Sequence, residues 1–261
     1  MSSMFISTQD LEKIHQDDSV LVLDARSYKD YSKGHIPGAV SLDLFSFHWA
    51  DTSQKGLINF GEHMRKILSY AGIDENKKII FYDDVTGMLA ARGVWMCLYF
   101  SHPDVQMLNG GISKWIEENL PTETESTIYT PSNFATPLDP SIIIGFEELN
   151  ENIGKVTIID ARSPDEFDGT IPRAARGGHI PTAKNIDWNN NIDASGKLKS
   201  DEYLESLYQM DRESQIITYC QGAYRAANSF LSLKKLGFKN VKVYLGSWGE
   251  WGNNLELPIE K

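Results

Sequence analysis

Two cysteines occur in the chain, and one of them, Cys220, stands where a sulfur nucleophile is expected. Cys220 directly follows the apolar run 216–219, which has the composition of a buried strand, and a helix-like stretch begins at residue 226. Because a helix N-terminus presents unpaired backbone N–H groups and partial positive charge, a thiol held there is favoured as the thiolate. The strand–loop–helix pattern therefore predicts covalent sulfur chemistry at Cys220.

The loop that Cys220 opens has the composition of an anion-binding turn. Gly222 permits the positive φ that such turns need, and Arg225 supplies a cation close to the sulfur. A lone cysteine after a strand is more often structural than catalytic, but the glycine, the arginine and the helix start together favour catalysis. We therefore predict Cys220 as the catalytic residue and the rest of the loop as substrate-binding: Gln221, Gly222, Ala223, Tyr224 and Arg225.

Loop length separates this pattern from phosphatases, which also place a cysteine and an arginine in one loop. Four residues lie between Cys220 and Arg225, whereas the tyrosine-phosphatase loop is one residue longer and forms a wider ring sized for phosphate. A phosphatase or arsenate reductase is therefore disfavoured. The second cysteine, Cys97, lies in the apolar helical stretch 95–100, and we predict that it is a small buried hydrophobe.

The sequence segments that are expected to position this loop occur twice in the chain. Four blocks recur in the same order: 22–27 as 158–163, 34–39 as 178–183, 79–83 as 216–220, and 105–108 with Trp115 as 241–244 with Trp251. This self-similarity indicates duplication of a whole domain. The copies differ where chemistry is expected, because the first half has Asp83 at the position of Cys220. Asp160, Arg162 and His179 have counterparts in the half without the cysteine, so we predict structural roles for them, with Asp160 and Arg162 forming an ion pair.

Short apolar runs alternate with helical patterns in both halves, which is typical of a parallel sheet covered by helices on both faces. The predicted fold is α/β, with two tandem domains that each hold a mainly parallel sheet flanked by helices. Four of the ten prolines fall within 118–140, a stretch with little periodicity. We predict an N-terminal domain at 1–120, an interdomain linker at 121–140 and a catalytic C-terminal domain at 141–261.

Composition limits the remaining classes of function. A formal net charge of −11 argues against nucleic acid and anionic membranes as partners. No apolar run has the length of a membrane span, and the N-terminus lacks the pattern of a signal peptide, so a cytoplasmic location is expected. Neither a cysteine-based zinc site nor a glycine-rich nucleotide motif stands out. We therefore expect no metal and no cofactor.

Four motifs stand out together: 160–163, 177–181, the loop at Cys220, and 246–251. With them the chain resembles the tandem-domain rhodaneses, the thiosulfate and 3-mercaptopyruvate sulfurtransferase family, over nearly its full length. The resemblance implies a catalytically inactive N-terminal domain and an active C-terminal one. It also implies double displacement, in which Cys220 takes sulfur from thiosulfate as a persulfide and passes it to cyanide or to a small or protein thiol.

Two departures from the family keep the substrate open. The loop has neither the Arg–Lys pair of mammalian thiosulfate-type loops nor the Gly-Ser-Gly-Val-Thr of mercaptopyruvate-type loops. Glu166 stands where vertebrate members have a substrate-binding arginine, and Arg176 or Arg173 is the candidate replacement. We expect thiosulfate to be the donor. The alternatives are a 3-mercaptopyruvate sulfurtransferase and, from another class, a sulfur-carrier or regulatory binding module with little turnover.

Overall fold

The structure is a computed structural model that describes residues 3–261 and divides into two compact units. Unit 1 contains the chain up to Phe47, Gly61–Asp139 and Ile192–Leu198. Unit 2 contains His48–Phe60, Pro140–Asn191 and Lys199–Lys261. Each unit therefore takes in one short segment from the other half of the chain.

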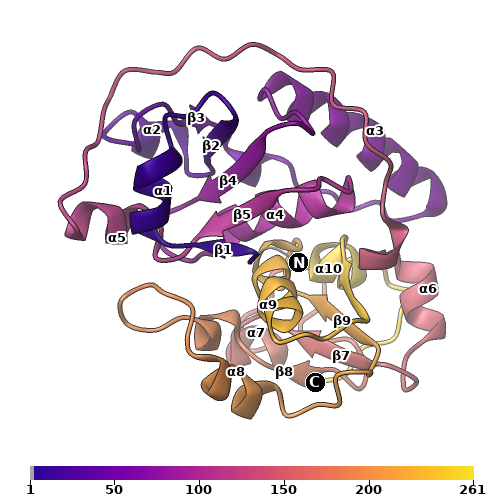
Figure 1. Cartoon of the computed structure of the whole chain (residues 1–261). Coiled ribbons are helices and arrows are strands. Elements are labelled where there is room, and N and C mark those ends of the chain that lie inside the picture. Colours follow the sequence, from indigo (N-terminus) through magenta and orange to yellow (C-terminus); the bar gives the residue numbers. More distant parts are fainter. Residues whose placement is uncertain (1–2) are drawn as a thin grey trace. The chain divides into compact units, whose positions relative to one another are not determined.

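Unit 1 is built on a five-stranded sheet in the order β1-β5-β4-β2-β3, and all its strand pairs are parallel (Figure 1). The strands are β1 (Phe5–Ile6), β2 (Val20–Asp24), β3 (Val40–Ser41), β4 (Lys78–Tyr82) and β5 (Val105–Leu108). The helices are α1 (Thr8–Ile14), α2 (Tyr28–Tyr31), η1 (Leu44–Ser46), α4 (Met88–Tyr99) and α5 (Gly111–Glu117), with α3 (Gln54–Tyr70) joining this unit from Gly61 onward.

Unit 2 repeats this topology, with five parallel strands in the order β6-β10-β9-β7-β8. The strands are β6 (Ile143–Ile144), β7 (Thr157–Asp160), β8 (Lys184–Asn185), β9 (Ile216–Tyr219) and β10 (Val241–Tyr244). The helices are η2 (Pro140–Ile142), α6 (Phe146–Glu151), α7 (Pro164–Phe167), η3 (Trp188–Asn191), α8 (Asp201–Tyr208), α9 (Tyr224–Lys235) and α10 (Ser247–Trp251). The predicted α/β fold with two parallel-sheet domains is confirmed.

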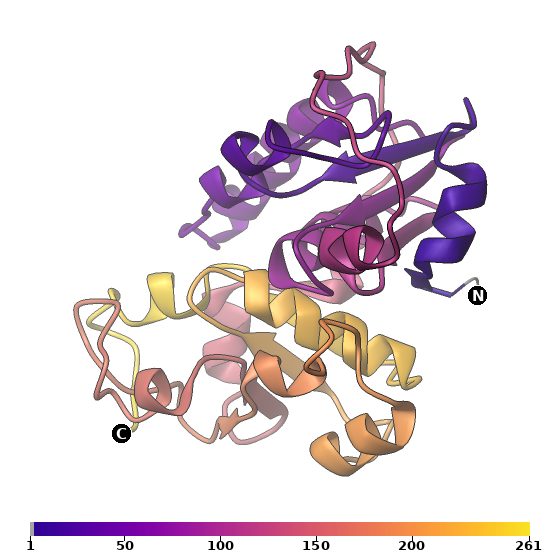
Figure 2. The same ribbon diagram turned by 90° about the vertical axis from the view of Figure 1, so that its left-hand side faces the viewer.

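Alternation along β9 explains how unit 2 covers both faces of its sheet. Thr218 points to one face, where its hydroxyl donates to the Ala226 carbonyl (3.1 Å) and α9 lies against β9 and β10 (Figure 2). Ile217 and Tyr219 point to the other face and join a core cluster with Trp248 and Trp251 of α10. All four residues of β9 are buried, as expected for the central strand of a parallel sheet.

Buried ion pairs brace the end of one strand in each unit, as the duplicated motif predicts. Arg162 Nη2 lies 2.5 Å from Asp160 Oδ2 and also donates to the Gly178 carbonyl (2.8 Å). In unit 1, Arg26 makes the same contact with Asp24 at 2.6 Å. Both carboxylates are fully buried, and each accepts from the guanidinium and the backbone N–H of its arginine; Asp24 also accepts from the Tyr82 hydroxyl (2.7 Å).

Among the described residues, none of the helices combines the length and the apolar character that a bilayer crossing requires.

Candidate active site at Cys220

Cys220 lies directly after the carboxyl end of β9 and is only 1% exposed. Its backbone N–H donates to Ser247 Oγ (3.2 Å), and its carbonyl accepts from the N–H of Trp248 (2.9 Å). The next carbonyl, that of Gln221, accepts from the N–H of Gly249 (2.9 Å). The first turn of α10 therefore holds the backbone on both sides of the thiol.

The loop closes on the N-terminus of α9 through a left-handed residue. Ala223 has a φ of 67°, and the 12-residue helix α9 starts immediately after it. A left-handed residue directly before a helix N-terminus is typical of backbone cradles that bind anions. The sequence-based expectation of a positive φ at Gly222 is wrong, because the strained position is Ala223. A Cβ at Gly222 would stand 2.7 Å from Cδ2 of His48, so a larger residue there would displace the imidazole.

The guanidinium of Arg225 forms an ion pair with the carboxylate of Glu166. Its Nη1 and Nη2 lie 2.5 Å and 2.9 Å from the two oxygens of Glu166, and both side chains are largely buried. Burial raises the pKa of Glu166, but the hydrogen bonds and the charge of Arg225 outweigh it and hold the pKa at about 2. Burial lowers the pKa of Arg225, but Glu166 and the neighbouring Cys220 raise it overall. The pair is therefore ionised and has no net charge.

Arg173 is the exposed cation at this end of the loop. Its Nη1 lies 3.6 Å from Glu166 Oε1, and about half of its side chain is accessible to solvent. Its carbonyl accepts from Gln221 Nε2 (3.0 Å), so the segment that carries Arg173 lies beside the loop. Gln221 Oε1 is buried and has no hydrogen-bond partner among the described residues.

Arg176 does not join this group. Its guanidinium donates to backbone carbonyls of the C-terminal segment: Trp251 (2.9 Å), Leu257 (2.8 Å), Gly252 (3.4 Å) and Asn254. These bonds use the donors that a substrate would need. The predicted substrate-binding role therefore passes to Arg173 as a proposal, and Arg176 is assigned to anchoring residues 251–257.

Unit 1 has a carboxylate in the place of the thiol. Asp83 accepts hydrogen bonds from the backbone N–H groups of Gly87 (3.0 Å), Leu89 (2.9 Å) and Ala90 (3.1 Å). Burial raises the pKa of Asp83 to about 6, although these three hydrogen bonds lower it. The Asp83 carboxylate thus occupies the cradle of its own loop.

The other cysteine and His179 have the surroundings of structural residues. Cys97 lies within α4 with no exposed surface, and burial raises the pKa of its thiol far above the usual value. His179 stacks on Phe167 at 3.7 Å between ring centroids, and its Nδ1 lies 3.0 Å from the Phe167 carbonyl. Both arrangements agree with the sequence-based interpretation.

Sequence reasoning missed Ser247 and His48, which both contact the Cys220 loop. Ser247 belongs to the motif at 246–251, but the sequence of that motif does not indicate that the Ser247 hydroxyl contacts Cys220. His48 is remote in the chain, and no local pattern connects it with residue 222. Only the packing of the segment His48–Phe60 in unit 2 brings them together.

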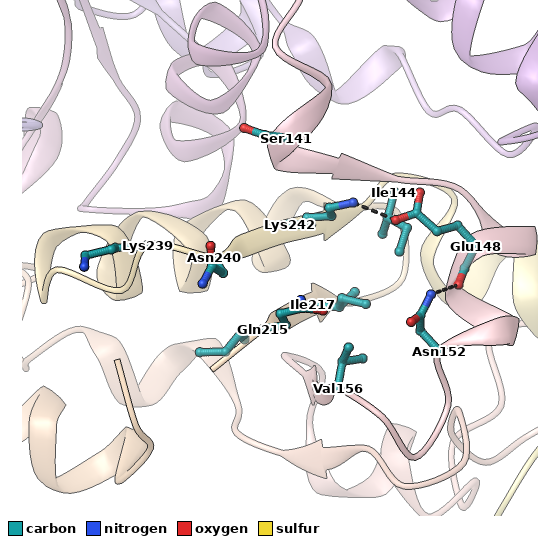
Figure 3. A pocket seen from close by; sticks show the side chains of 11 residues that line it. Ser141, Ile144, Glu148, Asn152, Val156, Gln215, Ile217, Lys239, Asn240 and Lys242 are labelled. Atoms are coloured by element: carbon teal, nitrogen blue, oxygen red, sulfur yellow. Dashed lines mark hydrogen bonds and ion pairs between the residues drawn. The ribbon is translucent and has the colours of Figure 1, made fainter. Parts of the chain in front are cut away.

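The hollow drawn in Figure 3 lies at the other end of the unit 2 sheet. Its volume is about 460 Å³, and its lining includes Val156, Gln215 and Asn240, which each directly precede a strand. Lys242 Nζ and Glu148 Oε1 form an ion pair at 2.6 Å on its rim. Because Cys220 follows the carboxyl end of β9, this hollow is separate from the candidate active site.

Two units of one parallel topology, the second with a buried cysteine after its central strand, define a tandem α/β protein with a cysteine-based site. The rhodanese-like domain family matches the chain twice, at residues 7–118 and 146–254. The chain therefore belongs to the rhodanese family and is a sulfurtransferase of that family.

Three known proteins illustrate the similarity. The sulfur carrier protein TtuD of Thermus thermophilus is 35% identical, over 99% of this chain and 96% of its own. A thiosulfate sulfurtransferase of Pseudomonas aeruginosa is 30% identical, over 92% and 91%. The crystal structure of the 3-mercaptopyruvate sulfurtransferase SseA from Escherichia coli superposes with a TM-score of 0.80 at 26% identity, over 95% of this chain and 99% of its own.

Proposed function

We propose that this protein moves sulfane sulfur from thiosulfate to cyanide or a thiol through a persulfide on Cys220. The observation that carries the proposal is that Cys220 is followed by the left-handed Ala223 and the N-terminus of α9, which is the arrangement of an anion-binding cradle. Such a cradle stabilises negative charge on sulfur without reorganising during the reaction. The carboxylate in the equivalent loop of unit 1 supports this function for the cradle, because it is an anion held by backbone N–H groups.

The reaction proceeds in two displacements. The Cys220 thiolate attacks the outer sulfur of thiosulfate, the S–S bond of the donor breaks, and sulfite leaves with the bonding electron pair. The nucleophilic atom of the acceptor then attacks the outer sulfur of the persulfide, and Cys220 leaves as the thiolate. Splitting one transfer into two steps in this way is covalent catalysis.

Donor binding is assigned to the backbone and side chains of the loop together with Arg173. The loop residues are Gln221, Gly222, Ala223, Tyr224 and Arg225. Because Glu166 cancels the charge of Arg225, the exposed guanidinium of Arg173 is the main attraction for a dianion. Thiosulfate capture is therefore expected to be weak, with a high KM.

A second candidate function is that of a sulfur carrier, which holds a persulfide and delivers it to one protein partner with little turnover on small acceptors. The observation that favours it is the 35% identity to the sulfur carrier protein TtuD over nearly all of both chains. A third candidate, transfer from 3-mercaptopyruvate, is supported by the superposition on SseA.

Mass spectrometry of the intact protein after incubation with thiosulfate tests the proposal. The expected result is a gain of one sulfur atom that disappears in Cys220→Ser and persists in Cys97→Ser. Cyanide should then remove the sulfur with multiple turnovers, whereas a carrier would give a single slow turnover. The ratio of kcat/KM for thiosulfate and 3-mercaptopyruvate, measured with cyanide, decides the donor. Absence of the added sulfur after both donors would contradict the proposal.

A further inference from the structure

A segment from the N-terminal half of the chain lies beside the Cys220 loop. His48–Phe60 belongs to unit 2, where Thr52 is 2% exposed and fixes the segment to α10. The Thr52 N–H donates to Glu250 Oε1 (2.7 Å), its hydroxyl donates to the other oxygen of Glu250, and the hydroxyl oxygen accepts from the Phe146 N–H (3.0 Å). Because α10 also holds the backbone at Cys220, the segment and the loop share one support.

His48 is the residue of this segment that reaches the loop. A Cβ built on Gly222 would stand 2.7 Å from Cδ2 and 3.1 Å from Nε2 of His48, so this edge of the imidazole faces the loop. The ring also lies 5.0 Å from the ring of Tyr224, between centroids. His48 is exposed to solvent. The imidazole is therefore open to solvent and lies beside Gly222 and Tyr224 of the Cys220 loop.

We propose that His48 is the acid–base group for thiol acceptors in the second displacement, an inference that depends on the proposed function. His48 takes the proton from the acceptor sulfur while that sulfur attacks the outer sulfur of the persulfide. The bond between the two persulfide sulfurs breaks, Cys220 leaves as the thiolate, and His48 returns the proton to the transferred sulfur. A thiol and the persulfide anion are thus converted into a new persulfide and the Cys220 thiolate, with atoms and charge conserved.

The need for His48 depends on the acceptor. A thiol has a proton on its nucleophilic sulfur, and an imidazole placed beside that sulfur can accept the proton on one ring nitrogen and return it. Sulfite has no proton on its sulfur and simply reverses the first displacement. Removal of the imidazole should therefore affect transfer to thiols and leave transfer to sulfite unchanged. A purely structural His48 would affect both acceptors equally.

The experiment uses the full-length protein. Cys220 is loaded with thiosulfate, excess donor is removed, and the loss of sulfur mass is followed after addition of either dithiothreitol or sulfite. The variants are His48→Phe, which keeps a ring beside Tyr224 but moves no proton, and His48→Ala, to which free imidazole is added. His63→Phe is the matched control, because His63 is an exposed histidine on α3.

Transfer to dithiothreitol is expected to fall on the order of 100-fold in both His48 variants, the usual scale for loss of a positioned acid–base group. Transfer to sulfite should stay within about twofold of the wild type, and imidazole should restore part of the thiol reaction in His48→Ala. Unchanged thiol transfer in His48→Phe would overturn the inference, as would an equal loss with both acceptors. If the wild-type chain takes up no sulfur from any donor, the proposed function itself fails and this inference fails with it.

Discussion

Replacement of Glu166 by glutamine is expected to improve the capture of thiosulfate. The wild-type carboxylate lies 2.5 Å and 2.9 Å from the two terminal nitrogens of Arg225 and cancels its charge beside the loop. Glutamine keeps the size of the side chain and one hydrogen-bond acceptor, but it removes the negative charge. The loop then gains a net positive charge where the thiosulfate dianion must bind.

The size of the effect follows from simple electrostatics. One added positive charge about 4 Å from a dianion contributes about 1–2 kcal/mol in surroundings close to bulk water, which equals about five- to thirtyfold in KM. The same change weakens the fold. The pKa of Glu166 falls from 4.5 to about 2 in the folded state, and at about 1.4 kcal/mol per pKa unit this gives an upper limit of about 3–4 kcal/mol for the ion pair. We expect the free energy of unfolding to decrease by about 1–3 kcal/mol.

Steady-state kinetics with thiosulfate and cyanide, together with urea unfolding, measure the two effects. Asp165→Asn is the matched control, because it removes the same charge from the neighbouring, exposed residue of α7. A KM for thiosulfate that is unchanged in Glu166→Gln would refute the argument. An equal decrease in the KM for thiosulfate in both variants would also refute it. The effect would then come from the overall negative charge of the protein and not from the ion pair with Arg225.

Three further predictions concern the thiols and the buried carboxyls. Cys220→Ser should abolish sulfur transfer while Cys97→Ser keeps most of it, and equal losses in two folded variants would contradict the assignment. Asp83→Cys should not give a second persulfide site by mass spectrometry, because its loop has the acid Asp84 next to the new thiol. In urea unfolding as a function of pH, Glu166, with a folded pKa of about 2 against 4.5, stabilises the protein above about pH 4.5 and loses this effect as the pH falls toward 2. Asp83, with a folded pKa of about 6 against 3.8, makes stability fall as the pH rises from about 4 to 6, and Asp83→Asn should remove that decline.

The fold could be predicted from the sequence because its signals are local and occur twice. Short apolar runs and helical periodicity are properties of neighbouring residues, and the duplication provided two independent samples of each. The ion pair between Asp160 and Arg162 could also be predicted, since two residues of separation after a strand end leave few alternatives. The loop from Cys220 into α9 was predicted for the same reason.

The partners of the loop residues could not be predicted because they depend on side-chain directions in three dimensions. Glu166 and Arg225 lie 59 positions apart, and nothing in either local pattern indicates that they pair. Arg176 was a reasonable substrate ligand by position, but its guanidinium turns toward the C-terminal carbonyls. The glycine at 222 suggested a positive φ, whereas its backbone has none and its missing Cβ leaves space for the imidazole of His48.

The two loops together explain how one half of a duplicated sulfurtransferase could lose its nucleophile and keep its fold. A cradle of inward N–H groups needs an anion or a hydrogen-bond acceptor, because unsatisfied buried donors are costly. In unit 1 the Asp83 carboxylate meets that need permanently, so its loop no longer requires a thiolate or a substrate. The N-terminal half nevertheless supplies His48–Phe60 to unit 2. If His48 serves thiol acceptors as proposed, this half is retained for the chemistry at Cys220 and not only as a relic of the duplication.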